Sequence, residues 1–263
     1  MAIRALSTAA SGMEAQQNTI DVIANNLANV NTAGFKRQRA NFADLLYQNV
    51  ERAGTTAPQN NQIPTGIQFG TGSRLTSTQR IFSQGSLEQT ENPGDIAIDG
   101  EGFFQVEYFS GESVYTRNGN FHIDSNGRLV TAEGFLLTPA VTIPQNASSF
   151  NVGKDGVVQA VYDDNTPPQQ VGQVTLARFV NPAGLQALGD NLFRESAASG
   201  TALTGTPGTA GFGAVSQRFL ELSNVQVVRE LVNMIKSQRA FEINASSIKA
   251  ADEMLQQING LRR

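Results

Sequence analysis

The sequence contains no cysteine and no tryptophan, and its one histidine is His122. Without cysteine, the chain cannot form a disulfide scaffold, a thiolate zinc site, an iron–sulfur cluster or a cysteine nucleophile. A Ser-His-Asp triad or a histidine metal cluster would have to rely on His122 alone. Charged residues make up only 16% of the chain, and the formal net charge of −4 argues against a nucleic-acid groove, which needs a basic face.

The sequence also shows no pattern typical of a targeting segment or a membrane-spanning helix. The first eight residues hold no apolar run of the kind found in a secretory signal peptide. No window approaches the roughly 18 apolar residues that a transmembrane helix needs. We therefore expect a chain that carries no cleaved signal and does not cross a membrane as a helix.

No motif in the sequence predicts catalysis or cofactor binding. Gly100-Glu101-Gly102 begins like a dinucleotide fingerprint, but Gln105 stands where the third glycine belongs. His122 lies in an alternating stretch that turns it toward solvent. A glycosidase would need a buried acidic pair, and the candidates lie in polar, turn-rich sequence: Glu88, Glu91, Asp95 and Asp99. We predict that the protein is not an enzyme and has no catalytic residue, cofactor or metal site.

The two ends of the chain have the pattern of long helices. Apolar residues recur every seven positions near the N-terminus, at Leu6, Met13, Ile20 and Leu27. They recur in the same way near the C-terminus, at Val227, Met234, Phe241, Ile248 and Leu255, with Leu231 at the partner position. Such a repeat allows two helices to keep one seam in contact along their length. The stop signals are Asn29 to Gly34 for the first helix and Gly260 for the second, and Ser223 with Gln226 suggests a capping box.

Two arrangements of these helices fit the periodicity. They can be ordinary amphipathic helices packed on a core, or they can pair as a coiled coil. The stripes are narrow, because Ala, Gln and Asp share the partner positions, and a narrow stripe suits contact between helices better than a broad sheet face. We therefore favour a coiled-coil domain built from both ends.

The middle of the chain, roughly 70–220, has the pattern of short antiparallel strands. Three turn dipeptides that favour hairpins separate the apolar runs, namely Asn118-Gly119, Asn126-Gly127 and Asp155-Gly156. In particular, Asn118-Gly119 predicts a hairpin between residues 113–116 and 121–123. The expected core comprises Phe103, Val106, Phe121, Ile123, Leu129, Val130, Phe135 and Leu137. Residues 54–64 and 196–213 are poor in large apolar residues and are expected to be loops or linkers.

The residues around the first helix stop resemble the N-terminal signature of the bacterial flagellar rod and hook family. The stretch runs from Ile23 to Lys36 and reads IANNLANVNTAGFK, with Asn25, Asn26, Leu27, Asn29, Gly34 and Phe35 as its most characteristic residues. Residues 231–242 (LVNMIKSQRAFE) are similar to the family's C-terminal helix. Residues 42–47, 63–72 and 83–106 resemble the distal-rod members of this family.

The resemblance implies a fold, a function and partners. It implies an α+β fold with a terminal coiled-coil domain and an antiparallel β-rich middle domain. It implies a structural subunit that polymerises helically with copies of itself into a rigid hollow shaft, which crosses the periplasm and carries torque from motor to hook. The implied partners are proximal rod and hook proteins, rings around the rod and the flagellar export apparatus, with no nucleic acid or small-molecule substrate.

These expectations divide the chain into four segments. They are an N-terminal helix at 1–40, a linking and bracing segment at 41–72, a β-rich domain at 73–222 and a C-terminal helix at 223–263. The heptad residues named above are the predicted subunit and coiled-coil contacts, and Asn25, Asn26 and Asn29 either end the helix or bond across a subunit contact. Alternatives that the sequence leaves open are a proximal rod or hook subunit, a cell-wall hydrolase and a coiled-coil adaptor with a β head.

Overall fold

The computed structural model describes residues 2–51, 65–163, 167–209 and 211–261. The chain forms two compact units. The helical unit comprises Met1–Leu27, Gln38–Gln79 and Gln226–Arg263, and the β unit comprises Ala28–Arg37 and Arg80–Val225. Each unit is described on its own below. Both are discontinuous in sequence, so residues from distant parts of the chain meet in each.

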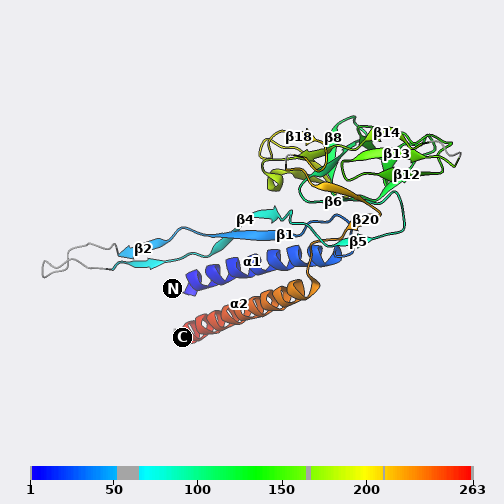
Figure 1. Cartoon of the computed structure of the whole chain (residues 1–263). Helices are drawn as coiled ribbons and strands as arrows, with labels where there is room; N and C mark the ends of the chain where they lie inside the picture. The colour runs from blue at the N-terminus through cyan, green and yellow to red at the C-terminus, as the bar shows by residue number, and fades with distance from the viewer. Residues whose placement is uncertain (1, 52–64, 164–166, 210, 262–263) are drawn as a thin grey trace. The chain divides into compact units, whose positions relative to one another are not determined.

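Two long helices dominate the helical unit. Helix α1 spans Ala2–Ala28 and helix α2 spans Val227–Leu261. At about 1.5 Å per residue their lengths are roughly 40 and 50 Å. They run antiparallel, with both chain ends at the same end of the pair (Figure 1). Gly12 of α1 lies against Asn244 of α2, since a Cβ at Gly12 would be 2.9 Å from the Asn244 amide nitrogen. The prediction that the two ends pair in one domain is confirmed.

The boundaries of α2 differ from the sequence signals. The Ser223 hydroxyl accepts a hydrogen bond from the Val225 amide at 3.3 Å, so it makes a local turn and the expected capping box does not form. The helix runs through Gly260 to Leu261, because one glycine weakens a helix without breaking it. In the part of the chain that the structure describes, neither helix is long and apolar enough to cross a membrane.

A two-stranded arm completes the helical unit. Strand β1 (Gln38–Asp44) pairs with β4 (Ser73–Arg80), and β2 (Gln48–Glu51) pairs antiparallel with β3 (Ile67–Phe69). The arm lies along α1, where the Arg4 guanidinium stacks 4.8 Å from the centre of the Phe69 ring. The described parts of the expected linking segment, residues 41–51 and 65–72, thus contribute to a β ribbon. The predicted loop at 54–64 lies outside the described residues.

The β unit is built around a nine-stranded sheet whose neighbouring strands pair antiparallel throughout the described residues. Its main path is β16-β17-β8-β7-β11-β10-β9, and β15 joins β7 and β18 to one side. Smaller sheets have the orders β12-β13-β14, β19-β6 and β20-β5. The strands are β5 (Leu87–Gln89), β6 (Ile96–Asp99), β7 (Phe103–Glu107), β8 (Ser113–Thr116), β9 (Phe121–Ile123), β10 (Leu129–Thr131), β11 (Leu136–Thr138), β12 (Ser149–Val152), β13 (Val157–Val161), β14 (Gln169–Gln173), β15 (Leu176–Arg178), β16 (Gln186–Gly189), β17 (Leu192–Arg194), β18 (Leu203–Gly205), β19 (Ala214–Gln217) and β20 (Phe219–Glu221), with a short 3-10 helix at Pro182–Gly184.

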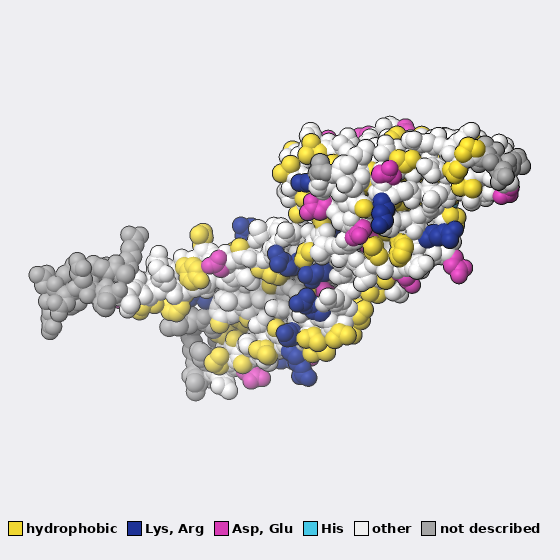
Figure 2. Space-filling model, viewed as in Figure 1, with side chains coloured by type: hydrophobic (Ala, Val, Ile, Leu, Met, Phe, Trp, Pro, Cys, Tyr) yellow, Lys and Arg dark blue, Asp and Glu magenta, His cyan; other side chains and the backbone are white. Residues whose placement is uncertain are grey.

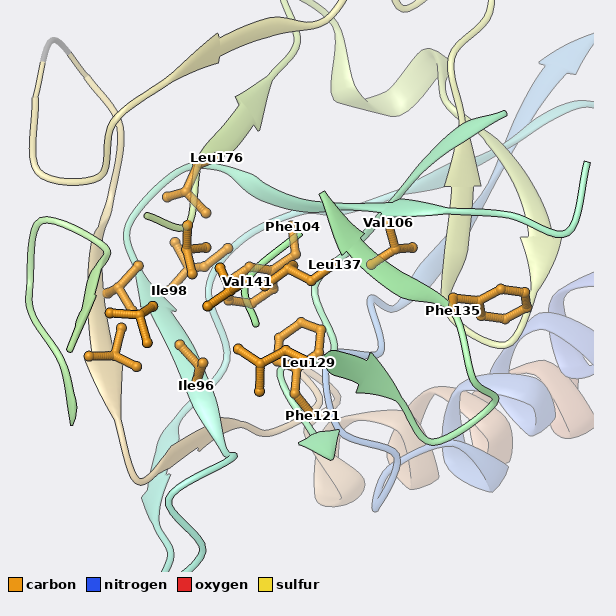
Figure 3. Close-up of a cluster of buried hydrophobic side chains, with 14 of the residues drawn as sticks. Ile96, Ile98, Phe104, Val106, Phe121, Leu129, Phe135, Leu137, Val141 and Leu176 are labelled. Atoms are coloured by element: carbon orange, nitrogen blue, oxygen red, sulfur yellow. The ribbon is translucent and has the colours of Figure 1, made fainter. Parts of the chain in front are cut away.

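The core of the β unit is a cluster of interlocking aliphatic and aromatic side chains (Figure 3). Most of the predicted core residues are buried: Phe103, Val106, Phe121, Leu129, Phe135 and Leu137. Val130 is only partly buried, and Ile123 is 51% exposed. The prediction for Ile123 is wrong, and this residue is the last of β9, a strand at the edge of the main sheet.

Two of the three predicted hairpin turns are confirmed. Asn126-Gly127 joins β9 to β10 and Asp155-Gly156 joins β12 to β13, and both glycines have a φ of +79°. The prediction of a hairpin at Asn118-Gly119 is wrong. Strand β8 pairs with β7 and β17, whereas β9 pairs with β10. Gly119 is needed for a different reason. Its carbonyl accepts a bond from the Ile96 amide at 2.9 Å, and a Cβ there would collide with the Ile96 carbonyl.

The glycine-rich stretch 196–213 is more ordered than its composition suggests. Within it, β18 pairs with β15 of the main sheet. The Ser196 hydroxyl donates to the Gly184 carbonyl at 2.6 Å, and Ser199 is buried. The expectation of a plain loop is therefore wrong for this segment, because backbone pairing and hydroxyl groups replace the missing apolar side chains.

Candidate functional site

On the inner face of α2, the predicted apolar stripe lies beside a second buried heptad position. The sequence did not predict that this second position would be buried. Glu230, Ser237 and Ala251 are buried, and Asn244 on the same heptad position is half-buried. These residues alternate with Met234 and Ile248 of the apolar stripe at spacings of three and four. Small and polar groups at this position allow close approach, as the contact between Gly12 and Asn244 illustrates.

The same offset occurs in α1. Ile23 is buried and its heptad neighbour Gln16 is half-buried. Ala24 and Gln17, one position later, are exposed. In both helices the sequence identifies the apolar stripe correctly. The second inward-facing heptad position, however, lies one residue earlier than the sequence predicts.

The predicted seam residues lie at the border between the inside and the surface. Leu6, Met13, Ile20, Leu27, Met234, Ile248 and Leu255 are half-buried. Val227, Leu231 and Phe241 are 37–42% exposed. One chain by itself therefore leaves much of this stripe open to solvent, and a subunit contact through it stays a prediction.

The outer face of α2 is apolar for much of its length. Val228, Val232, Ile235, Ile243 and Met254 are all at least 46% exposed. Figure 2 shows apolar side chains gathered over this helix among basic ones. Monomeric proteins rarely leave a patch of this kind uncovered, and it is typical of a surface that binds another protein.

The signature asparagines make different contacts. Asn26 is buried, its amide nitrogen donates to the Gln38 carbonyl at 2.9 Å, and its amide oxygen accepts from the Gln38 backbone N–H at 2.8 Å. This pair of bonds ties the end of α1 to the start of β1. The Asn29 side chain accepts a bond from the Thr32 hydroxyl at 3.3 Å in the turn that follows the helix. Asn25 is exposed on α1.

Gly34 and Phe35 fix the signature segment within the β unit. Gly34 has a φ of +71°, and a Cβ there would lie 2.6 Å from the Asn118 nitrogen. Its own amide donates to the Glu221 carbonyl at 2.8 Å. Phe35 is buried. These two residues therefore have roles inside the chain that explain why this turn needs glycine and an aromatic ring.

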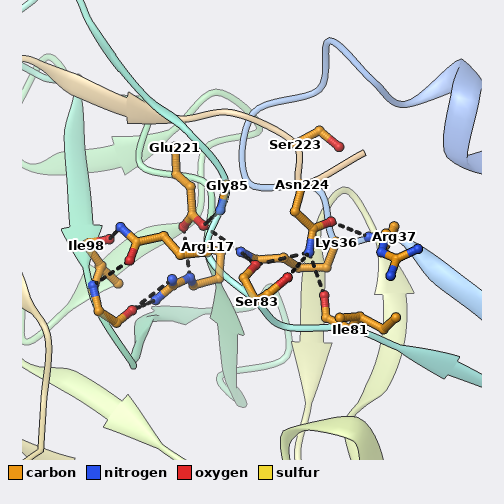
Figure 4. Close-up of polar contacts among 12 residues, drawn as sticks. Lys36, Arg37, Ile81, Ser83, Gly85, Ile98, Arg117, Glu221, Ser223 and Asn224 are labelled. Atoms are coloured by element: carbon orange, nitrogen blue, oxygen red, sulfur yellow. Dashed lines mark hydrogen bonds and ion pairs between the residues drawn. The ribbon is translucent and has the colours of Figure 1, made fainter. Parts of the chain in front are cut away.

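A buried charge cluster follows directly in the sequence (Figure 4). The ammonium group of Lys36 lies 2.5 Å from one carboxylate oxygen of Glu221, and the Arg117 Nε lies 3.0 Å from the other. All three side chains are at least 95% buried. Glu221 thus holds two cations that come from loop segments far apart in sequence.

Backbone groups make further hydrogen bonds with this cluster. The Gly85 amide donates to Glu221 at 2.8 Å, and Lys36 donates to the Ser83 carbonyl at 2.9 Å. The Arg117 Nη1 donates to the Gly100 and Gly102 carbonyls at 3.0 and 2.6 Å. We infer that the cluster fastens the loops around Lys36, Gly85 and Gly100 to one another.

Burial shifts the pKa of Lys36 within this cluster. Loss of hydration lowers the pKa of Lys36 from its ordinary 10.5, Glu221 opposes this shift, and the nearby Arg117 adds to it. The unfolded chain therefore keeps the Lys36 proton to higher pH than the folded chain does. By linkage, the contribution of Lys36 to folding free energy becomes more favourable as the pH rises between the lowered pKa and 10.5.

Sequence reasoning did not find Arg117 or Glu221. Glu221 is the last residue of β20 and Arg117 directly follows β8. An isolated charge at the end of a short strand looks like a solvent-facing residue. The available signal was Lys36, a charged residue directly after the buried Phe35. Its partner lies 185 positions away, and one sequence offers no way to pair them.

The candidates for chemistry remain dispersed. His122 is exposed, as expected. Among the acidic candidates, Glu88, Glu91 and Asp99 are exposed, and the buried Asp95 accepts a bond from the Asn92 amide at 3.1 Å. Within the described ranges, no three side chains of the types that bind metals gather into a group that could hold an ion.

Comparison with family models matches three parts of the chain. Residues 6–36 match the model described as flagella basal body rod protein. Residues 97–160 match the flagellar hook protein FlgE/F/G D1 domain, and residues 216–261 match the C-terminal model of flagellar basal body rod FlgEFG proteins.

Similar proteins span the whole chain. The flagellar basal-body rod protein FlgG of Caulobacter vibrioides is 50% identical over 99% of this chain and 100% of its own length. The FlgG protein of Borreliella burgdorferi is 47% identical over 99% of both chains. The FlgG protein of Bacillus subtilis is 40% identical over 99% of this chain and 100% of its own.

Proposed function

The chain belongs to the FlgG family of flagellar basal-body rod proteins, and from that membership we propose that its copies polymerise helically into a rigid hollow distal rod. The family is structural and not an enzyme family. The chain is thus a structural subunit of the flagellar rod. In our proposal the assembled shaft transmits torque from the motor to the hook.

The observation that carries this proposal is the exposed apolar face of α2. Burying a side chain such as Ile235 releases about 1.5–3 kcal/mol relative to leaving it in water, and it is 56% exposed in the single chain. A neighbouring copy that covers this face gains a share of that free energy at several positions, in proportion to the exposed part of each side chain. If the covering surface differs from α2 itself, the contact is heterologous and propagates as an open helical filament.

The arm of the helical unit is the second element that we assign to assembly. It exposes Phe42, Leu46, Tyr47, Val50 and Ile67, and Leu46 is 90% exposed. A two-stranded ribbon with apolar side chains on its surface can lie across a neighbouring copy. In our proposal the arm braces adjacent subunits and makes the shaft stiff.

The proposed partners follow from the chain's membership in a family of basal-body rod proteins. Family membership supports assembly with other rod and hook components. More specifically, we propose end contacts with proximal rod and hook proteins and side contacts with the surrounding rings. We also propose that the flagellar export apparatus delivers the chain across the membrane without cleavage of a signal peptide.

Electron microscopy of the concentrated full chain tests the proposal. We expect straight hollow tubes from the wild-type protein. Ile235→Glu places a charge on the apolar face and should abolish the tubes while the folded monomer persists, as judged by its unfolding transition. Lys236→Glu, the next residue along the helix and also exposed, is the matched control and should assemble. Wild-type protein that stays monomeric with and without added hook and rod partners would refute the proposal.

A further inference from the structure

The turn between β7 and β8 presents an exposed aromatic side chain. We call residues 107–112 the Phe109 knob. Phe109 is 79% exposed at its tip. Two backbone bonds close the turn, from Tyr108 to Glu112 at 2.9 Å and from Gly111 to Tyr108 at 2.8 Å. The knob is thus a defined projection and not a loose loop.

The knob is held in place by the core beneath it. The Phe109 ring lies 4.7 Å from the buried Phe135 ring, and the Tyr108 ring stacks on Phe135 at 5.2 Å. An aromatic side chain that is already fixed loses little conformational entropy on binding, which is why such residues dominate interfaces. The knob has the properties of a binding anchor.

Carboxylates flank this anchor. Glu107 and Glu112 stand at the two ends of the turn, and both are exposed. Glu112 pairs with Arg194 at 2.7 Å, which leaves Glu107 as the side chain best able to reach a new cation. The knob therefore suits an apolar pocket with a basic rim.

The β unit contains a pocket of this kind. We call it the β12–β19 groove, because it lies between these two strands, and its volume is about 630 Å³. Its walls include the buried Phe150, Val152 and Val215. Its size falls within the range of about 300–1,000 Å³ that is usual for binding sites.

The charge of the groove is opposite to that of the knob. Lys154 and Arg218 both line it and are both exposed, and its lining contains no acidic residue. The Gln217 side chain bridges the two strands, accepting from the Val152 amide at 3.0 Å and donating to the Phe150 carbonyl at 3.1 Å. This bridge ties the two walls of the groove to each other.

A chain cannot fill its own groove with its own knob. The knob stacks on Phe135, which lies at one end of the core, while Ile96 and Ile98 of β6 lie at the other end (Figure 3). Strand β19, which forms one wall of the groove, pairs with β6. A second copy of the chain is therefore the occupant that brings the two surfaces together.

We propose that the Phe109 knob of one copy seats in the β12–β19 groove of the next copy. The inference rests on the proposed function, since it names a contact between subunits of the assembly. The two surfaces differ, so the contact is heterologous and adds copies in one direction without closing on itself. Glu107 then approaches the basic rim of the neighbouring groove.

Engineered cysteines test the contact, because the natural chain has none and every disulfide reports an introduced pair. We expect the full chain carrying Phe109→Cys and Ser216→Cys to form a ladder of dimers and longer species under mild oxidation at high concentration. The control replaces Phe109→Cys by Val180→Cys, a residue that is 84% exposed in the same unit. A ladder no stronger than that of the control overturns the proposal.

Assembly measurements give an independent readout. Phe109→Ala should raise the protein concentration needed for assembly about tenfold, as expected for a central aromatic anchor, whereas Val180→Ala should change it less than about twofold. Glu107→Lys and Lys154→Glu should each weaken assembly, and the double variant should recover most of it. Unchanged assembly of Phe109→Ala contradicts the proposal.

The outcomes separate this inference from the proposed function. Straight tubes without the disulfide ladder overturn the knob contact and leave the rod function standing. A ladder in concentrated solution without tubes supports the knob contact and counts against the rod function. The ladder is read in both cases, so the contact is decided whether or not tubes form.

Discussion

At the scale of single residues, the most consequential group is Glu221. A chain with only 16% charged residues places three of them in one buried cluster. Taking ions out of water is unfavourable, and it is tolerated only when the charges pair and their remaining groups are hydrogen-bonded. Here Lys36, Arg117 and the Gly85 amide surround one carboxylate.

Glu221→Gln should destabilise the β unit by about 3–5 kcal/mol. The amide keeps the size of the side chain but leaves Lys36 and Arg117 buried without a counter-charge. The measurement is the free energy of unfolding in urea at neutral pH. Lys36→Met in the Glu221→Gln background should recover part of the loss, because it removes one of the two stranded cations.

Glu88→Gln is the control for this substitution. Glu88 lies on β5, which pairs with the β20 strand that carries Glu221, but its side chain is exposed. We expect a change within about 0.5 kcal/mol. An equally small effect of Glu221→Gln would show that the cluster does not stabilise the fold.

Asp124 provides a pH-dependent prediction. Its hydrogen bond with Arg128, and next its bonds from Ser125, lower its pKa below the ordinary 3.8. The charged carboxylate therefore supports the β9–β10 turn fully above about pH 3.8, and this support is lost as the pH falls through the lowered pKa. Carbon NMR titration should give a midpoint below 3.8, and Arg128→Gln should move that midpoint upward. A midpoint that does not move in the variant would rule out the guanidinium as the main cause.

At the scale of elements, the terminal helices meet through small and polar residues. Gly12 leaves room for Asn244, and Glu230, Ser237 and Ala251 occupy the buried heptad position of α2. The more apolar flank of the same helix is left on the surface. A helix that must contact both its own chain and a neighbour divides its faces in this way.

Gly12→Leu should weaken the pairing of the helices. Even a Cβ at this position meets the Asn244 side chain at 2.9 Å, and a full leucine has to displace that side chain from its place between the helices. Overpacking of this kind typically costs about 1–3 kcal/mol. Amide hydrogen exchange should show faster exchange in the middle of both helices.

Ala10→Leu is the matched control on the same helix. Ala10 is exposed, so a leucine there should leave exchange in α2 unchanged. Equal exchange rates in wild type and Gly12→Leu would mean that the helices do not depend on close approach at this point.

At the scale of the whole molecule, both units are assembled from separated stretches of the chain. The helical unit takes its helices from the two ends and its arm from residues 38–79. The β unit takes residues 28–37, which include the second half of the signature, and residues 80–225. In our proposal, a filament of such subunits joins copies through the elements that each unit leaves exposed.

Deleting residues 54–64 should make filaments softer or curved. The segment lies between β2 and β3 of the arm and contains Pro58 and Pro64, which restrict backbone freedom. The measurement is filament curvature in electron micrographs. Replacing both prolines with alanine should give an intermediate effect. Filaments of the deletion variant that remain as straight as wild type would contradict a bracing role.

The local patterns of the sequence determined much of this protein. Seven-residue spacing predicted both helices, and Asn126-Gly127 and Asp155-Gly156 predicted turns that the structure contains. Alternation predicted most of the core and the exposure of His122. These features depend on neighbouring residues alone, since helical periodicity and positive φ are properties of a few consecutive positions.

Tertiary structure decided the features that require distant partners. It placed Glu221 between Lys36 and Arg117, assigned Gly119 to a close approach instead of a hairpin, and gave the stretch 196–213 a strand. It also turned Glu230 inward where the sequence favours Leu231. The physical reason is that burial and pairing are properties of the assembled chain, because a side chain's environment is set by residues that its own neighbourhood in the sequence does not contain.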